Sequence, residues 1–126
     1  VPNPLQWAAA AAYNDEAHVE QSRARYRTKF DLADRLLKGR FNYKRPQGGF
    51  CLWLDVSAHG NDEIATQKLW REAGVRVIPG SYLATTQVDG SNPGKNYIRV
   101  ALVQDEATTE DALNRILATL DQVQAA

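Results

Sequence analysis

Arg99 is the residue whose type and place in this sequence most favour recognition of a small charged molecule. It lies in a segment that alternates apolar and polar residues, directly after a long glycine-rich connection. A guanidinium group can bind a carboxylate through two parallel charge-assisted hydrogen bonds, which fix both its position and its orientation. The same pattern is typical of an arginine whose aliphatic part lies along a solvated sheet face. The residue pattern alone leaves both interpretations open.

Side chains that could bind a soft metal ion are few and widely spaced. Cys51 is the single cysteine, and His18 and His59 are the two histidines. They lack the close paired spacing of zinc sites, so we expect no metal. A lone cysteine in an apolar run is typical of a small buried residue in a reducing compartment, which favours a cytoplasmic protein.

The lysines of the chain are poor candidates for a covalent bond to a cofactor. A lysine that forms a Schiff base needs a desolvated or cation-flanked pocket to be nucleophilic at neutral pH. The five lysines instead have charged or polar neighbours; they are Lys29, Lys38, Lys44, Lys68 and Lys95. We expect each to be a solvated surface residue. No glycine-rich loop opens a helix, so nothing indicates a phosphate site.

The charge balance argues against nucleic acid and membranes as partners. Fifteen basic and fifteen acidic residues give a net charge of zero, so no global field attracts a polyanion. One local cluster mixes cations with aromatic rings: Lys38, Arg40, Phe41, Tyr43, Lys44 and Arg45. Single-stranded nucleic acid could stack there, but without a known binding motif a solvated edge segment is the favoured interpretation. No segment has the roughly 20 apolar residues that cross a membrane.

Length and composition are typical of one globular domain. The chain has 126 residues, 44% hydrophobic and 24% charged, and a chain of this length can bury a core without disulfides. It begins with Val1 and contains no methionine, so we expect it to be a piece of a longer protein.

Two helices are predicted before any strand. Pro4, followed by an alanine-rich run with Trp7, is typical of a short helix. A second helix is predicted over about 15–38, because apolar residues recur at alternating steps of four and three, and Gly39 is placed to end it. Its repeating face, polar only at Arg23, comprises Val19, Arg23, Tyr26, Phe30, Ala33 and Leu37.

Three strands are predicted farther along, over 50–56, 75–78 and 97–103. They are rich in apolar or β-branched residues, and breakers precede or follow them. The last alternates most clearly, with Arg99 on its polar side. The segment 79–96 has no periodicity, and so long a connection in a compact domain is usually functional or disordered. One face of the first strand is expected to comprise Phe50, Leu52, Leu54 and Val56.

Two more helices are predicted, one over about 61–73 and one capped by Thr109. The apolar stripe of the last helix comprises Leu113, Ile116, Leu117, Leu120 and Val123. Amphipathic helices around short strands predict an α+β fold, in which a small sheet of three or four strands is covered by helices on one face. The other sheet face needs no such cover.

Three segments together resemble the small domain of fold-type I aminotransferases. They are Pro-Gln-Gly-Gly-Phe-Cys-Leu-Trp-Leu at 46–54, Gly-Val-Arg-Val-Ile-Pro-Gly-Ser at 74–81 and Asn-Tyr-Ile-Arg-Val-Ala-Leu at 96–102. Their order and spacing match along essentially the whole chain. The resemblance implies one C-terminal small domain over 1–126, in which the helices of 1–38 connect from a large domain outside the chain. It also implies pyridoxal 5'-phosphate as cofactor and a cytoplasmic homodimer.

Residue by residue, the resemblance gives two positions a role. Arg99 matches the family's arginine that binds the substrate α-carboxylate, and Phe50 matches a residue that lines the mouth of the active site. The family's cofactor lysine, pyridinium-contacting aspartate and phosphate-binding residues belong to the large domain, and no segment here matches them. We therefore expect neither a catalytic nor a cofactor-binding residue in this chain, and no activity from it alone.

Within the family, the segments around Trp7, around 14–19 and at 48–55 are most similar to the succinyldiaminopimelate aminotransferases. This implies amino transfer between glutamate and N-succinyl-2-amino-6-oxopimelate, in diaminopimelate and lysine synthesis. The implied partners are amino-acid and 2-oxo-acid substrates and the chain's own large domain. The segment 79–96 is expected at the substrate-facing edge, on a domain that closes like a lid. Exposed apolar surface is expected around Trp7, where the missing domain would pack.

Two other functions remain open at this point. A non-catalytic module could have kept the fold to bind a ligand or partner, and a β-lyase acting on amino acids could have kept both fold and cofactor. A lysine-bearing large domain directly upstream would argue against the first alternative. Product analysis would separate the second from a transaminase.

Overall fold

The computed structural model describes residues 1–121. Its helices are α1 (Asn3–Asn14), α2 (Ala17–Leu37), α3 (Asp62–Lys68) and α4 (Glu106–Asp121), and its strands are β1 (Cys51–Asp55), β2 (Ile78–Pro79) and β3 (Tyr97–Ala101). A π-helical turn, Leu69–Ala73, continues α3, and short 3-10 turns lie at Ser57–His59 and Gly80–Tyr82. No helix in this part of the chain is long and apolar enough to cross a membrane.

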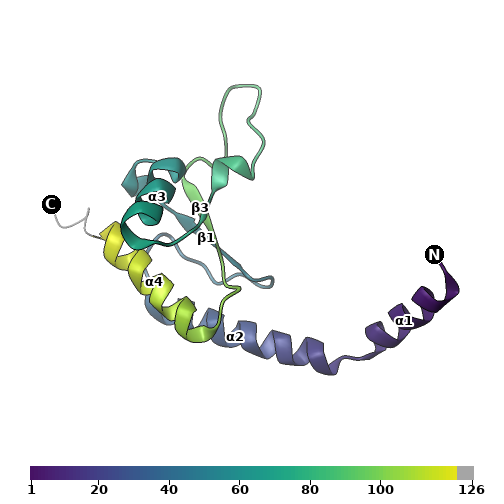
Figure 1. Ribbon diagram of the computed structural model, residues 1–126. Coiled ribbons are helices and arrows are strands. Elements are labelled where there is room, and N and C mark those ends of the chain that lie inside the picture. The colour runs from purple at the N-terminus through teal and green to yellow at the C-terminus, as the bar shows by residue number, and fades with distance from the viewer. Residues whose placement is uncertain (122–126) are drawn as a thin grey trace.

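The three strands form one antiparallel sheet in the order β1-β3-β2, so β3 is the central strand. Helices α2 and α4 pack against each other, and α3 packs against β2 and β3 (Figure 1). The core lies between these helices and one sheet face. Its largest fully buried apolar side chains are Leu37, Leu52, Leu54, Val56, Leu69, Ile98, Leu102, Leu113, Ile116 and Leu120. The predicted α+β fold, with one face of the sheet covered by helices, is confirmed.

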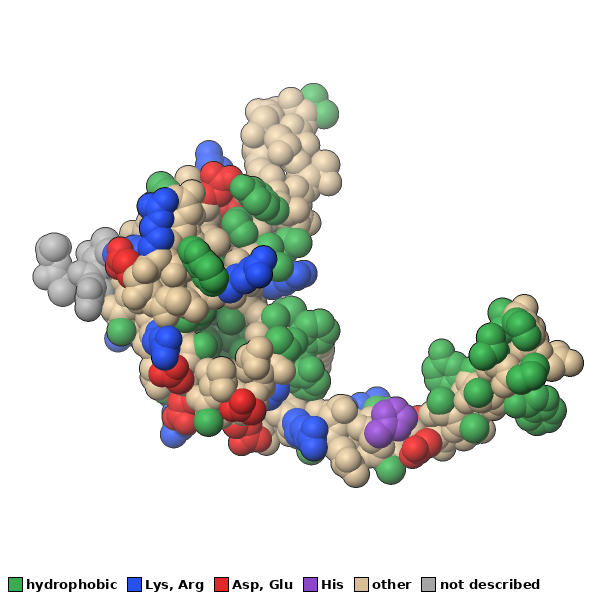
Figure 2. All heavy atoms as spheres, viewed as in Figure 1, with side chains coloured by type: hydrophobic (Ala, Val, Ile, Leu, Met, Phe, Trp, Pro, Cys, Tyr) green, Lys and Arg blue, Asp and Glu red, His purple; other side chains and the backbone are tan. Residues whose placement is uncertain are grey.

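Residues 1–25, which we call the arm, extend away from residues 26–120, which we call the body (Figure 1). None of the arm residues is buried, and Val19 alone among them is half-buried. Pro4 in the first turn and the alanine run favour α1 through local propensity. Apolar side chains gather at the free end of the arm (Figure 2), and Trp7 is 78% exposed there. The expected exposed apolar surface around Trp7 is present.

Two elements, β2 and α4, begin at residues other than those predicted. The strand expected over 75–78 was wrong except at its last residue, because the Val75 amide donates to the carbonyl of Leu69 in the π-helical turn and is not available to the sheet. The last helix starts before Thr109, which is buried within α4. Asp105 is positioned to cap this helix instead, since its carboxylate accepts hydrogen bonds from the amide and hydroxyl of Thr108.

Phe50 was expected on the buried face of the first strand, and this was wrong, because its side chain is 47% exposed and contacts the Tyr26 ring of α2. The strand begins one residue later, at Cys51. Asn61 caps α3, since its side chain accepts a hydrogen bond from the Ile64 amide. Val123, expected in the stripe of the last helix, lies outside the described residues.

Candidate functional site

The sheet face opposite the core has Arg99 at its centre. Arg99 pairs with Trp53 on one neighbouring strand and with Ile78 on the other. Directly opposite residues in antiparallel strands project from the same face. The alternation of burial along β1 and β3 gives the membership of this face. The open face, as we call it, therefore comprises Cys51, Trp53, Asp55, Ile78, Tyr97, Arg99 and Ala101.

Arg99 is half-buried, and its Nε atom is buried without a hydrogen-bond partner among residues 1–121. A buried donor that lacks an acceptor typically costs about 1–3 kcal/mol. A guanidinium group has five N–H donors in a planar fork, which matches the two oxygens of a carboxylate. The open face thus presents a guanidinium group whose Nε lacks an acceptor in the described part of the chain, on a strand that is paired on both sides.

An aromatic pair lies beside Arg99. The Trp53 and Tyr97 rings stack with centroids 5.5 Å apart and planes 13° from parallel. The far edge of the indole reaches Gly80, where an added Cβ would lie 2.9 Å from Trp53 Cη2. The same Cβ would lie 2.4 Å from the carbonyl oxygen of Gly94 and 2.7 Å from that of Tyr97. Only glycine fits at position 80 without a shift of the backbone or the indole.

The connection after β2 is closed at its base, although the sequence suggested no regular structure there. The buried carboxylate of Asp62 accepts a hydrogen bond of 2.8 Å from the Ser81 amide, and its own amide donates to the carbonyl of Lys95. The Asn92 side chain donates to the carbonyl of Ser81 and accepts from the Gly94 amide. Both ends of this connection are therefore fixed next to the start of β3, while its middle extends outward (Figure 1).

Lys29 is not the solvated residue that the sequence suggested. Its side chain is buried at 8% exposure, and Nζ donates a hydrogen bond of 2.9 Å to the carbonyl of Leu102. Nζ also lies 5.0 Å from the centroid of the Tyr26 ring. Burial without a carboxylate partner is tolerated because the carbonyl and the ring face both favour a cation. Lys29 and Phe50 thus both contact Tyr26 of α2.

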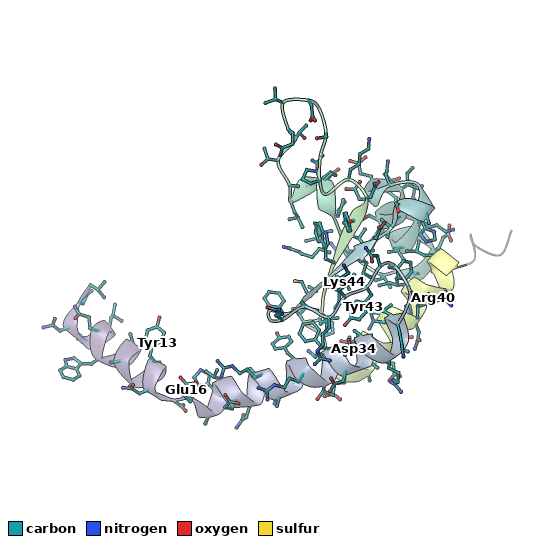
Figure 3. The ribbon with its side chains drawn as sticks, turned by 180° about the vertical axis from the view of Figure 1, so that it is seen from behind. Tyr13, Glu16, Asp34, Arg40, Tyr43 and Lys44 are labelled. Atoms are coloured by element: carbon teal, nitrogen blue, oxygen red, sulfur yellow. The ribbon has the colours of Figure 1, made fainter. Side chains whose placement is uncertain are left out.

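Two members of the cluster of cations and aromatic rings after α2 bind carboxylates within the body. The Tyr43 hydroxyl donates a 2.6 Å hydrogen bond to Asp34, and Arg45 binds both Asp31 and Asp34. Figure 3 shows Tyr43 beside Asp34 on the neighbouring helix. Partial burial and the bond to Asp34 raise the pKa of Tyr43. Burial opposes ionisation of Asp34, but hydrogen bonds from Tyr43 and Arg45 lower its pKa overall. Tyr43 and Arg45 of the cluster are therefore engaged by carboxylates of α2.

Neither a cofactor anchor nor a metal site is formed by the described residues. The three strands contain no lysine. The single buried lysine, Lys29 of α2, already donates a hydrogen bond to the backbone carbonyl of Leu102. No group of three or more His, Cys, Asp or Glu side chains within residues 1–121 could hold a metal ion. The open face therefore offers a cation, Arg99, to a carboxylate, and it offers no lysine to an aldehyde cofactor.

Two residues of this site were not identified from the sequence. Trp53 was read only as part of an apolar run, although alternation along the strand places it opposite the buried Leu52 and Leu54. Gly80 was read only as a loop residue. Period-two alternation could have placed Trp53 on the polar face, but its position beside Arg99 depends on pairing between distant segments.

Comparison with known proteins relates nearly the whole chain to one family. The profile of the family "Aminotransferase class I and II" matches residues 1–116. The solved structure of an aminotransferase from Neisseria meningitidis is 38% identical, with a TM-score of 0.85, over 93% of this chain and 29% of that one.

Curated relatives give the same result. The 4-dedimethylamino-4-oxo-anhydrotetracycline transaminase of Streptomyces rimosus is 31% identical over 118 residues, which are 92% of this chain and 30% of that protein. The LL-diaminopimelate aminotransferase of Syntrophobacter fumaroxidans is 28% identical over 116 residues, or 90% of this chain and 28% of that protein. The chain thus spans less than a third of the length of the proteins it matches.

Proposed function

The chain belongs to the class I and II aminotransferase family, and on this premise we propose that it is the part of a pyridoxal-phosphate-dependent aminotransferase that binds the substrate α-carboxylate. The observation that carries the proposal is Arg99, a half-buried arginine on the central strand whose Nε has no acceptor among the described residues. A carboxylate on the open face accepts hydrogen bonds from the guanidinium group and is oriented by its planar fork. Arg99 then positions the substrate and takes no proton from it.

The cofactor site belongs, in this proposal, to residues outside the chain. The open face has no lysine, and Lys29, on α2, donates to the backbone carbonyl of Leu102. The arm supports the same division, because its apolar side chains, including Leu5 and Trp7, lack cover. We propose that the enzyme's own large domain covers them and carries the cofactor lysine, and that this chain alone is inactive.

For the reaction, we propose amino transfer between glutamate and N-succinyl-2-amino-6-oxopimelate in a cytoplasmic homodimer. The segments similar to succinyldiaminopimelate aminotransferases support this substrate pair, as does a relative that is named for LL-diaminopimelate. Both substrates carry an α-carboxylate or 2-oxo-carboxylate group that Arg99 could bind. Product analysis with the full-length enzyme tests the pair, and sedimentation tests the dimer.

The carboxylate role of Arg99 is tested by Arg99→Ala in the full-length enzyme. Loss of a charge-assisted pair should cost at least about 1.5–3 kcal/mol of transition-state binding, or roughly a 10- to 150-fold fall in kcat/KM. Arg71→Ala is the matched control, because this arginine is exposed on the helical layer. An unchanged kcat/KM for glutamate in Arg99→Ala would refute the role.

The position of the cofactor lysine is tested separately. Borohydride reduction of the full-length enzyme, followed by peptide mapping, marks any lysine that carries the cofactor. We expect the label outside residues 1–126. A label on one of the chain's lysines would contradict the proposed division of the active site, and no label at all would favour a non-catalytic binding protein.

A further inference from the structure

We propose that Trp53 is a specificity-determining residue, whose indole is an apolar surface for the hydrocarbon part of a carboxylic acid bound to Arg99. This inference rests on the proposed function and goes beyond it, because it assigns a substrate class to the neighbourhood of the carboxylate site. The class is acids with an unbranched chain of methylene groups, or a flat ring, next to the carboxylate end.

The position of the indole is fixed by three contacts across the sheet. Trp53 is on β1 and lies directly opposite Arg99. Its ring stacks on Tyr97 of β3, and its far edge lies against Gly80, which follows β2. Because β3 lies between the other two strands, the indole crosses the central strand on the Tyr97 side of the arginine.

Although it is held in this way, Trp53 remains 43% exposed. Large apolar side chains on a face of this kind are candidates for ligand contact when they lie beside a polar anchor. A ring that is already ordered by stacking loses little conformational freedom when a ligand covers it. The indole therefore offers a preorganised apolar surface.

The remaining neighbours of Arg99 leave room for a ligand of this class. On the side away from Tyr97, the paired residues Cys51 and Ala101 are small. Ile78, opposite Arg99 on β2, is 37% exposed and adds apolar surface on the other flank. The nearest carboxylate on the open face, Asp55, accepts a hydrogen bond from the Ser57 amide. A ligand thus meets one cation among apolar and small side chains.

The test uses the full-length holoenzyme and the straight-chain acids from propanoate to hexanoate. These acids have no amino or oxo group to react, so competitive inhibition of amino transfer measures their binding. If the hydrocarbon part of the acid lies on the indole, each added methylene should lower the inhibition constant roughly two- to fourfold in the wild type. Trp53→Ala should make the inhibition constant nearly independent of chain length, and Trp53→Phe should keep an intermediate dependence.

Two further variants separate this role from general damage. Arg99→Lys should weaken every acid by a similar factor and keep the gain per methylene. Trp70→Ala, at a tryptophan that is 60% exposed in the π-helical turn, should change neither quantity. A full gain per methylene in Trp53→Ala would overturn the inference, as would its equal loss in Trp70→Ala.

The outcome also distinguishes this inference from the proposed function. Wild-type enzyme that binds the acids with no dependence on chain length would overturn the role of Trp53 alone. Wild-type enzyme that neither binds these acids nor transfers amino groups would overturn the proposed function and this inference with it. If Trp53→Ala does not fold, a wild-type dependence on chain length in Trp53→Phe would overturn the role equally.

Discussion

The arm and the body meet within one continuous helix, but only the body has a core. Along α2, Phe30, Ala33 and Leu37 are buried, whereas the residues before Tyr26 are exposed apart from half-buried Val19. Isolated helices shorter than about 12–15 residues are marginal in water even when they are rich in alanine. The comparison shows that the body is stabilised by its own packing, and that the arm has helix-forming residues whose apolar side chains are not covered by any of residues 1–121.

The sharpest test of this contrast is a pair of leucine substitutions. Leu54→Ala, at a fully buried position between sheet and helices, should destabilise the body by about 2–5 kcal/mol. Leu5→Ala, at a position that is 59% exposed in the arm, should change stability by less than about 0.5 kcal/mol. Urea unfolding of the chain, followed by circular dichroism, measures both. Equal effects would mean that the arm packs on the body.

A smaller effect is expected at the glycine beside the aromatic pair. Gly80→Ala places a Cβ within 2.4–2.9 Å of two carbonyl oxygens and the Trp53 ring, and overpacking of this kind costs about 1–3 kcal/mol. Gly48→Ala is the control, because a Cβ there meets nothing within 4 Å. Thermal unfolding measures both variants. If Gly80→Ala were as stable as Gly48→Ala, the close approach of the indole and the two backbones would be wrong.

The smallest expected effect is on how the stability of the body depends on pH. Hydrogen bonds from Tyr43 and Arg45 lower the pKa of Asp34, although its partial burial works in the opposite direction. A carboxyl group with a lowered pKa stabilises the folded state above its unfolded pKa of about 3.9, and this contribution is lost as pH falls through the folded pKa. Asp34→Asn should therefore flatten the loss of stability below about pH 4. An identical pH profile in the variant would contradict this assignment.

Most of the fold could be predicted from the sequence, because helices and strands differ in the period of their apolar residues. The steps of three and four through Phe30, Ala33 and Leu37, and the alternation around Arg99, predicted α2 and β3 correctly. The strand at 75–78 could not be placed, because an amide within it bonds to the π-helical turn. Such competition between partners is not encoded in local periodicity.

For the candidate site, the sequence indicated Arg99 but not its surroundings. Lys29 was misread because its acceptor, the carbonyl of Leu102, is 73 residues away. The proximity of Trp53 to Arg99 likewise depends on the register between β1 and β3. Burial and pairing of this kind are properties of the folded chain, whereas the chemical type of a side chain can be read directly.

Because the connection between β2 and β3 is closed at its base, its length can vary without disturbing the sheet. Asp62 binds the backbone at Ser81 and Lys95, and a Cβ on Gly94 would lie 2.1 Å from the carbonyl oxygen of Gly80. With both ends fixed, each doubling of the enclosed length costs only about 0.6 kcal/mol of closure entropy. Residues can therefore be inserted or deleted at the tip, near Val88, without moving the strand that carries Arg99. The length and sequence of the tip can thus change, in evolution or by engineering, independently of the position of Arg99.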